Sequence, residues 1–151
     1  MITIIRTNSN NTHFQNLVKE LDKDLAIRDG DEHAFYSQFN KTDKIKEAIV
    51  AYDGDLAVGC GAIRAYDENS MEVKRMWVEP SHRGKGIASL MLRELEAWTK
   101  ELGFPKCILE TGNKQLEAIE LYKKNKYTII ENYGPYQGVA NSVCFEKALI
   151  N

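Results

Sequence analysis

Two glycines between a strand-like segment and a helix-like segment constrain this chain more than any other feature. The stretch reads Arg83-Gly84-Lys85-Gly86-Ile87-Ala88 and follows an apolar run that ends near Val78. Glycine permits a tight turn and a close approach of the backbone to a ligand. The first amides of the following helix have no partner within that helix and lie at the positive end of its dipole. The stretch therefore predicts an anion site suited to phosphate or pyrophosphate, to which Arg83 and Lys85 add positive charge.

Hydrophobic periodicity predicts the N-terminal half of the fold. A helix is expected after residues 9–12, any of which could cap it, because apolar residues recur at helical spacing from Phe14 to Leu25. Asp53-Gly54 is a strong hairpin signal between two strands. The expected elements are a strand at 2–6, a helix within 9–27, a short helix or ordered loop at 31–39, and strands at 45–52, 56–65 and 71–78.

The C-terminal half predicts alternating helices and strands. A helix over 85–102 has one apolar face, made of Ile87, Met91, Leu95, Trp98 and Leu102, and Gly103 ends it. A strand at 106–110, a helix at 114–124, and strands at 127–130 and 142–147 follow. This order predicts an α+β fold with a mixed sheet. One right-handed crossover, over 71–110, should place two parallel strands side by side.

Composition bounds the class of protein. At 151 residues the chain is one domain, residues 1–151, and no linker or repeat divides it. A formal net charge of −2 argues against a nucleic-acid-coating protein, which would be strongly basic. No window approaches the roughly 18 apolar residues of a membrane span. The first residues turn polar after Ile5, so we expect neither a signal peptide nor an anchor. We therefore expect a cytoplasmic protein.

The cysteines and histidines predict no metal site. Cys60, Cys107 and Cys144 are far apart, and the three histidines are equally scattered, whereas a zinc site needs clustered ligands. Each cysteine neighbours apolar residues in a strand-like segment. We therefore expect small buried side chains in a reducing compartment.

The glycine loop alone leaves the phosphate ligand open. A Walker loop is absent, because GxxxxGK[ST] does not occur. If the stretch is a dinucleotide-binding Rossmann loop, Gly84 and Gly86 are two of its three glycines and Ser89 replaces the third. Glu110, at the end of the next strand, would be its acidic residue. Against it, five residues separate the strand from the first glycine, and a single crossover unit is visible.

The same stretch also resembles the acetyl-CoA pyrophosphate loop of the GNAT N-acetyltransferase superfamily, whose pattern is (Gln/Arg)-x-x-Gly-x-(Gly/Ala). Residues 73–80 look like that family's fourth strand and residues 109–113 like its fifth. Residues 118–127 resemble its next helix and strand, with Asn125 where many members carry glycine. The resemblance implies a three-layer fold with helices on both faces of a mostly antiparallel sheet, whose fourth and fifth strands splay apart.

The resemblance assigns the acetyl-CoA contacts. The pantetheine arm would lie between the splayed strands and pair with the backbone of Met76, Trp77 and Val78, one of whose N–H groups could stabilise the oxyanion. The pyrophosphate would be held by seven consecutive residues: Arg83, Gly84, Lys85, Gly86, Ile87, Ala88 and Ser89. Asn113 matches an asparagine that contacts the cofactor arm; a plain helix N-cap is its alternative role.

The resemblance also suggests the catalytic groups. Tyr122 matches the tyrosine that protonates the departing thiolate, the alternative being a packed aromatic residue with a satisfied hydroxyl. Glu72 lies where one branch of the superfamily carries its general base, the alternative being a cross-strand ion pair. Glu79 and Glu110 are weaker candidates for the base.

The expected activity is direct transfer of acetyl from acetyl-CoA to a primary amine in a ternary complex, without a metal. Tyr133 and Tyr136 are candidates for the acceptor pocket, because a glycine-flanked loop often sets specificity. The acceptor, a small molecule or a peptide, is left open, as is a homodimer. A non-catalytic acyl-CoA sensor and the Rossmann-like binder are the alternatives.

Overall fold

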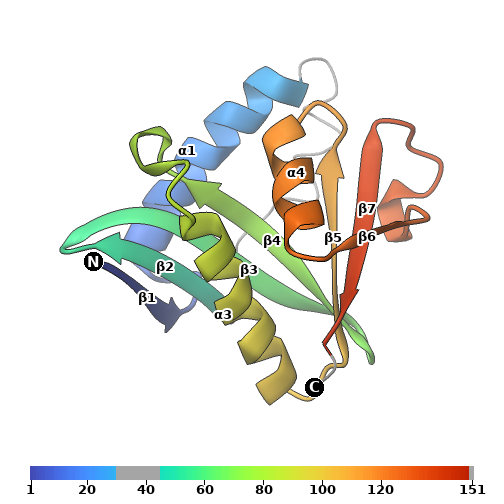
Figure 1. The fold of residues 1–151 in the computed structure, drawn as a ribbon, viewed down its shortest axis with the longest axis horizontal. Coiled ribbons are helices and arrows are strands. Elements are labelled where there is room, and N and C mark those ends of the chain that lie inside the picture. The colour runs from blue at the N-terminus through green and yellow to red at the C-terminus, as the bar shows by residue number, and fades with distance from the viewer. Residues whose placement is uncertain (30–44, 150–151) are drawn as a thin grey trace.

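The computed structural model describes residues 1–29 and 45–149 of the chain. Figure 1 shows the order of elements along those residues. The first half comprises β1 (Ile2–Thr7), α1 (Thr12–Asp29), β2 (Glu47–Asp53), β3 (Leu56–Asp67) and β4 (Ser70–Val78). The second half comprises α3 (Ile87–Glu101), β5 (Lys106–Gly112), α4 (Leu116–Lys124), β6 (Thr128–Ile130) and β7 (Ser142–Ala148). The element expected at 31–39 lies outside the described residues.

The strands form one seven-stranded sheet in the order β1-β2-β3-β4-β5-β7-β6. Neighbouring strands are antiparallel except β4 and β5, which are parallel and joined through α3. The mixed, mostly antiparallel sheet and its one crossover confirm the predicted fold class. A dinucleotide-binding Rossmann domain is built on a parallel sheet, so this topology excludes that alternative.

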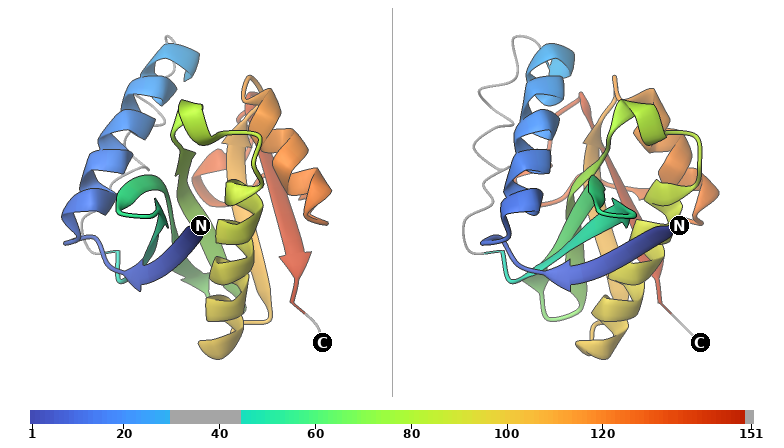
Figure 2. Two further views of the ribbon diagram at one scale, coloured as in Figure 1. Left: turned by 60° about the vertical axis from the view of Figure 1, so that its left-hand side comes forward. Right: turned by 90° about the vertical axis from the view of Figure 1, so that its left-hand side faces the viewer.

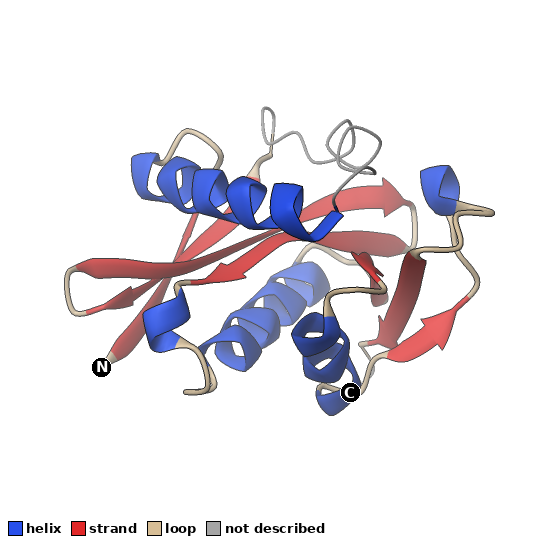
Figure 3. Ribbon diagram, turned by 90° about the horizontal axis from the view of Figure 1, so that it is seen from above, coloured by secondary structure: helices blue, strands red, loops and turns tan. Residues whose placement is uncertain are grey.

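Helices cover both faces of the sheet. Figure 3 shows α1 on one face and α3 with α4 on the other, and the two views of Figure 2 show the same layering from the side. The larger core lies under α3 and α4, where Met91, Leu92 and Leu95 are fully buried. A smaller core lies under α1 and is centred on Phe14. The three layers agree with the predicted architecture.

Local sequence signals explain most element ends. Asn11 caps α1, because its side-chain oxygen accepts a hydrogen bond of 2.9 Å from the amide of Phe14. Gly54 makes the β2–β3 turn at a φ of 63°. One expectation was wrong. Leu102 is 42% exposed instead of lying on the apolar face, because α3 ends one residue before it. The helix expected at about 114–124 is α4, which begins at Leu116.

Candidate functional site

Strands β4 and β5 separate soon after they begin to pair. Their parallel register covers Ser70 to Glu72 on β4 and Lys106 to Ile108 on β5. On its other side, β4 stays paired with β3 as far as Val78. From Val73 onward, the edge of β4 that faces β5 is therefore unpaired with that strand. An unpaired strand edge presents N–H and C=O groups to whatever lies beside it.

A bulge at Arg75 accompanies this separation. Arg75 adopts a φ of 61°, which is rare for a residue with a side chain, and the register with β3 shifts between Cys60 and Ala62. Its guanidinium donates a hydrogen bond of 2.5 Å to Asp22 of α1. The bulge bends β4 away from a regular sheet, as such irregularities generally do.

A cavity of about 740 Å³ lies at the separation. It is lined by residues 72–78 of β4, the loop and first turn of α3 at 82–84 and 86–89, residues 110–112 of β5, and α4. Leu21, Asp24 and Leu25 of α1 also line it. Helix α1 lies on the face of the sheet opposite α3 and α4 (Figure 3). The volume lies within the range of small-molecule sites.

The glycine loop forms an open anion site at the beginning of α3. Gly84 and Gly86 have φ values of 79° and 80°, so both require the left-handed conformation that glycine adopts at little cost. A Cβ atom at either position would meet no heavy atom within 4 Å. Gly86 is the N-cap of α3 and no side chain caps that end. The first amides of α3 are therefore available to an anion.

Arg83 is held in place beside this loop. Its Nε donates a hydrogen bond of 2.9 Å to the carbonyl of Val78, and its guanidinium lies 4.5 Å from the ring centroid of Trp77. Stacking on an aromatic ring is a common arrangement for guanidinium groups. The cation is thereby fixed at the cavity wall. Lys85, by contrast, is exposed and does not line the cavity.

Tyr122 is buried and faces the same cavity from α4. Its ring packs against Tyr127 and Phe145, with centroids 5.7 and 5.8 Å away. Among the described residues, no group forms a hydrogen bond with the hydroxyl of this packed ring. Burial, and then the charge of Glu110, raise the pKa of Tyr122. The phenol is therefore a neutral donor at physiological pH.

Glu72 is buried in β4 and lines the cavity. The hydroxyl of Tyr133 donates a hydrogen bond of 2.7 Å to its Oε2. Arg64, its register partner on β3, and Lys74 approach Oε1 at 3.5 and 3.7 Å. The predicted cross-strand ion pair is thus present, at a carboxylate that also faces the cavity. Burial, and then the charge of Glu72, raise the pKa of Tyr133.

The remaining candidates divide into those at the cavity and those away from it. Glu110 and the buried Tyr136 line the cavity, whereas Glu79 does not. Asn113 also does not line it; its backbone amide and side chain bond Asn141 instead, at 2.8 and 3.4 Å. Gln115 rather than Asn113 is the N-cap of α4, so the alternative role for Asn113 was wrong.

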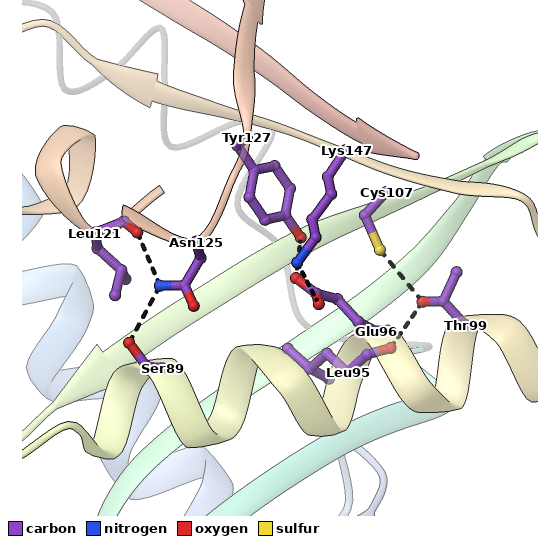
Figure 4. A network of polar contacts seen from close by, with 9 residues as sticks. All are labelled: Ser89, Leu95, Glu96, Thr99, Cys107, Leu121, Asn125, Tyr127 and Lys147. Carbon is purple, nitrogen blue, oxygen red and sulfur yellow. Dashed lines mark hydrogen bonds and ion pairs between the residues drawn. The ribbon is translucent and has the colours of Figure 1, made fainter. Parts of the chain in front are cut away.

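Sequence reasoning missed two cationic residues and one amide. Lys74 and Arg75 are buried in β4 and line the cavity. The available signal was a Lys-Arg pair inside a strand whose neighbouring residues, Val73 and Met76, are apolar. Asn125 ends α4, and its amide donates hydrogen bonds to Ser89 Oγ at 3.1 Å and to the carbonyl of Leu121 at 2.9 Å (Figure 4). It therefore connects the helix of Tyr122 to the first turn of α3.

Two other kinds of site are absent from the described residues. Residues 1–29 and 45–149 contain no group of three or more His, Cys, Asp or Glu side chains that could hold a metal ion. No helix in these same ranges is long and apolar enough to span a membrane. The three cysteines are buried and free, as expected.

Comparison with known sequences gives a consistent result. The model of the acetyltransferase (GNAT) family matches residues 14–127. An IAA acetyltransferase of Azospirillum brasilense is 37% identical over 102 residues, which are 67% of this chain and 67% of that protein. The uncharacterized N-acetyltransferase YsnE of Bacillus subtilis is 32% identical over 101 residues, 66% of this chain and 67% of its own.

Solved structures share the whole fold. A protein from Klebsiella pneumoniae assigned as an acyl-CoA N-acyltransferase superimposes with a TM-score of 0.83 at 30% identity, covering 99% of both chains. The PaiA N-acetyltransferase of Thermoplasma acidophilum, solved in complex with coenzyme A, has a TM-score of 0.73 at 15% identity, with 98% of this chain and 99% of that chain covered. At that identity the second likeness concerns the fold alone.

Proposed function

Because the chain belongs to the acetyltransferase (GNAT) family, we propose that its cavity binds acetyl-CoA and that the enzyme transfers the acetyl group to a primary amine by direct attack in a ternary complex. The observation that carries this proposal is the gap between β4 and β5, which opens beside an uncapped helix N-terminus. An extended acyl-pantetheine arm needs a strand edge, and its pyrophosphate needs an anion site. The cavity offers both within one continuous space.

The backbone of Met76, Trp77 and Val78 would pair with the pantetheine arm, and one of their N–H groups would stabilise the oxyanion at the thioester carbonyl. The carbonyl of Val78 already accepts the hydrogen bond of Arg83, so the groups left for the ligand are the other backbone groups of this stretch that do not pair with β3. Residues 83–89 would hold the pyrophosphate, with the α3 amides as the main donors. Lys85 stays a prediction for this role, and Asn113 stays a prediction for contact with the cofactor arm.

Tyr122 would supply the proton that the leaving group needs. In the transfer, the amine nitrogen bonds to the acetyl carbon, the carbon–sulfur bond breaks, and the thiolate takes the phenolic proton to become a thiol. A raised pKa keeps the phenol protonated at neutral pH. The hydroxyl has no partner among the described residues to compete with the sulfur. General acid catalysis of this kind contributes about 10²- to 10⁴-fold.

Glu72 would accept the proton of the amine. An unperturbed alkylammonium has a pKa of about 10.4, so a base is required to form the nucleophile at neutral pH. Glu72 faces the cavity, and the hydrogen bond from Tyr133 holds its carboxylate in one orientation. Glu110 lines the same cavity from β5 and is the alternative base.

Two measurements test the proposal. Calorimetric titration of the protein with acetyl-CoA, CoA and NAD should give binding of the first two, weakened in Arg83→Ala. Tyr122→Phe should lower kcat by roughly 10²-fold or more, with little change in acetyl-CoA affinity. Wild-type turnover in Tyr122→Phe would remove the acid role. Binding of acetyl-CoA without turnover of any amine would leave a sensor, and absence of CoA binding would defeat the proposal as a whole.

A further inference from the structure

We propose that the acceptor is an amine that carries a carboxylate on the same carbon, as in an α-amino acid, and that Lys74 binds this carboxylate while Glu72 receives the amine. The inference rests on the proposed function, which leaves the acceptor class open. It arises from a buried cation that the acetyl-CoA chemistry does not use.

Lys74 lies on the side of the gap that is left for an acceptor. Side chains alternate along β4, so Met71 and Val73 belong to the core under α3, and Glu72 and Lys74 point to the opposite face. Tyr122 belongs to the α3 side as well. An amine that adds to the thioester carbonyl from the side of the gap away from Tyr122 therefore approaches from the face of α1, where Lys74 and Glu72 line the cavity.

The ammonium of Lys74 is buried and has few polar partners. The residue is 8% exposed, and its Nζ lies 3.7 Å from Glu72 Oε1, beyond hydrogen-bond distance. Among the described residues, Lys74 donates no hydrogen bond, although an ammonium has three N–H donors. The other oxygen of Glu72 already accepts the hydroxyl of Tyr133. Burial lowers the pKa of Lys74, which is the effect expected of an under-compensated cation.

The neighbouring guanidinium groups are engaged elsewhere. Arg75 donates to Asp22, and its side chain is 1% exposed. Arg83 is fixed by the carbonyl of Val78 and the ring of Trp77. Of the three cations on or next to this part of β4, Lys74 is therefore the one that lines the cavity without a hydrogen bond to any described residue.

A carboxylate-bearing amine complements the Lys74–Glu72 pair. Its two charged groups are attached to one carbon, so they lie side by side as Lys74 Nζ and Glu72 Oε1 do at 3.7 Å. Each charge of the acceptor would then meet the opposite charge of the protein. An amine without the carboxylate would leave the ammonium of Lys74 unsatisfied, and a site built around a buried polar group discriminates strongly against such an analogue.

The test compares acceptors that differ in the carboxylate alone. Each L-amino acid is assayed beside its carboxamide and its decarboxylated amine, for example L-phenylalanine, L-phenylalaninamide and phenethylamine, by release of the CoA thiol. We expect kcat/KM for the carboxylate form to exceed that of both analogues by about 10- to 100-fold for the preferred side chain, the size expected for one charge-assisted contact. Lys74→Met should erase this preference through the KM of the amino acid, and Lys74→Arg should retain part of it.

Lys123→Met is the matched control, since Lys123 is an exposed lysine of α4 that does not line the cavity. Its preference should equal that of the wild type. Equal or better use of the carboxylate-free amines by the wild type, or an equal loss for all acceptors in Lys74→Met, would overturn the inference. So would binding of acetyl-CoA without acetylation of any amino acid. Because acetyl-CoA binding is measured separately by calorimetry, a wild type that does not bind it would reveal failure of the proposed function itself.

Discussion

Replacement of Lys147 by methionine should destabilise the protein, because it removes one partner of a buried carboxylate. Glu96 projects from α3 toward β7, where its Oε1 accepts a bond of 2.9 Å from Lys147 and its Oε2 one of 2.9 Å from the hydroxyl of Tyr127 (Figure 4). The side chain of Glu96 is 11% exposed and that of Lys147 is 25% exposed. Without Lys147, a buried negative charge would keep a single neutral donor.

The structure sets the expected size of the effect. Removal of one partner from a fully buried ion pair costs about 3–5 kcal/mol. Water can reach Glu96 Oε1 where Lys147 leaves, because a quarter of the lysine side chain is exposed, and methionine preserves much of the apolar contact of the stem. We therefore expect a loss of about 2–3 kcal/mol in the free energy of unfolding. For a chain of this length, that loss corresponds to a decrease in Tm of about 4–12 °C.

Thermal and urea unfolding of Lys147→Met would measure this loss. The matched control replaces the whole network by apolar groups, in the triple variant Glu96→Leu, Tyr127→Phe and Lys147→Met. Because no polar group is then left unpaired, the triple variant should lie within about 1 kcal/mol of the wild type. A loss below about 0.5 kcal/mol in the single variant, or a triple variant less stable than the single one, would refute the reasoning.

Three other predictions concern separate contacts. Asn125→Ala removes the bonds to Ser89 and Leu121 and should cost about 1–3 kcal/mol of stability, with a coupling of about 0.5–1.5 kcal/mol to Ser89→Ala in a double-mutant cycle. Arg6→Met breaks the paired bonds to Glu101. Arg6 lowers the pKa of Glu101, so the contribution of this ion pair to the free energy of unfolding is present above the usual pKa of glutamate and is lost as the pH falls through the lowered value. The difference in Tm between Arg6→Met and the wild type should therefore shrink from pH 7 to pH 3. A constant difference would contradict this. Burial raises the pKa of every cysteine thiol, to about 12 for Cys60 and about 11 for the other two, so the thiols stay protonated and should resist alkylation at pH 8 until urea unfolds the chain. Because the folded state holds these protons more tightly, the free energy of unfolding should decline as the pH rises above the ordinary thiol pKa of about 8.5. Rapid alkylation of the native protein would contradict the prediction, because it would show that the thiols are accessible.

The sequence predicted the elements well, because their signals are local. Apolar spacing located α3 between two strands, Asp53-Gly54 located the hairpin, and the single crossover predicted the parallel pair of β4 and β5. The glycine loop predicted an anion site, and the structure has an uncapped helix end there. The apolar spacing, the hairpin turn and the glycine loop are each patterns of residues that lie close together in the chain, and the crossover follows from the order of the elements.

The charged network around Glu72 could not be predicted in the same way. Its members come together through the register of β3 with β4 and through a loop 61 residues away, which brings Tyr133 to the carboxylate. The burial of Lys74 at the cavity was not predicted, because a lysine in a strand is usually exposed. The bulge at Arg75 is equally hidden, since the residue type gives no sign of a left-handed conformation.

The short pairing of β4 with β5 has a consequence for the amount of enzyme in a cell. Three residue pairs join the first four strands of the sheet to the last three, so a ligand that fills the gap would act as the missing part of the sheet. Such a ligand binds the folded state alone and stabilises it by RT ln(1 + [L]/Kd), about 2.7 kcal/mol at a hundredfold excess over Kd. On the proposed function, that ligand is acetyl-CoA. When the acetyl donor becomes scarce, proteases would meet the opened chain more often, and the abundance of the enzyme would follow the supply of its own substrate.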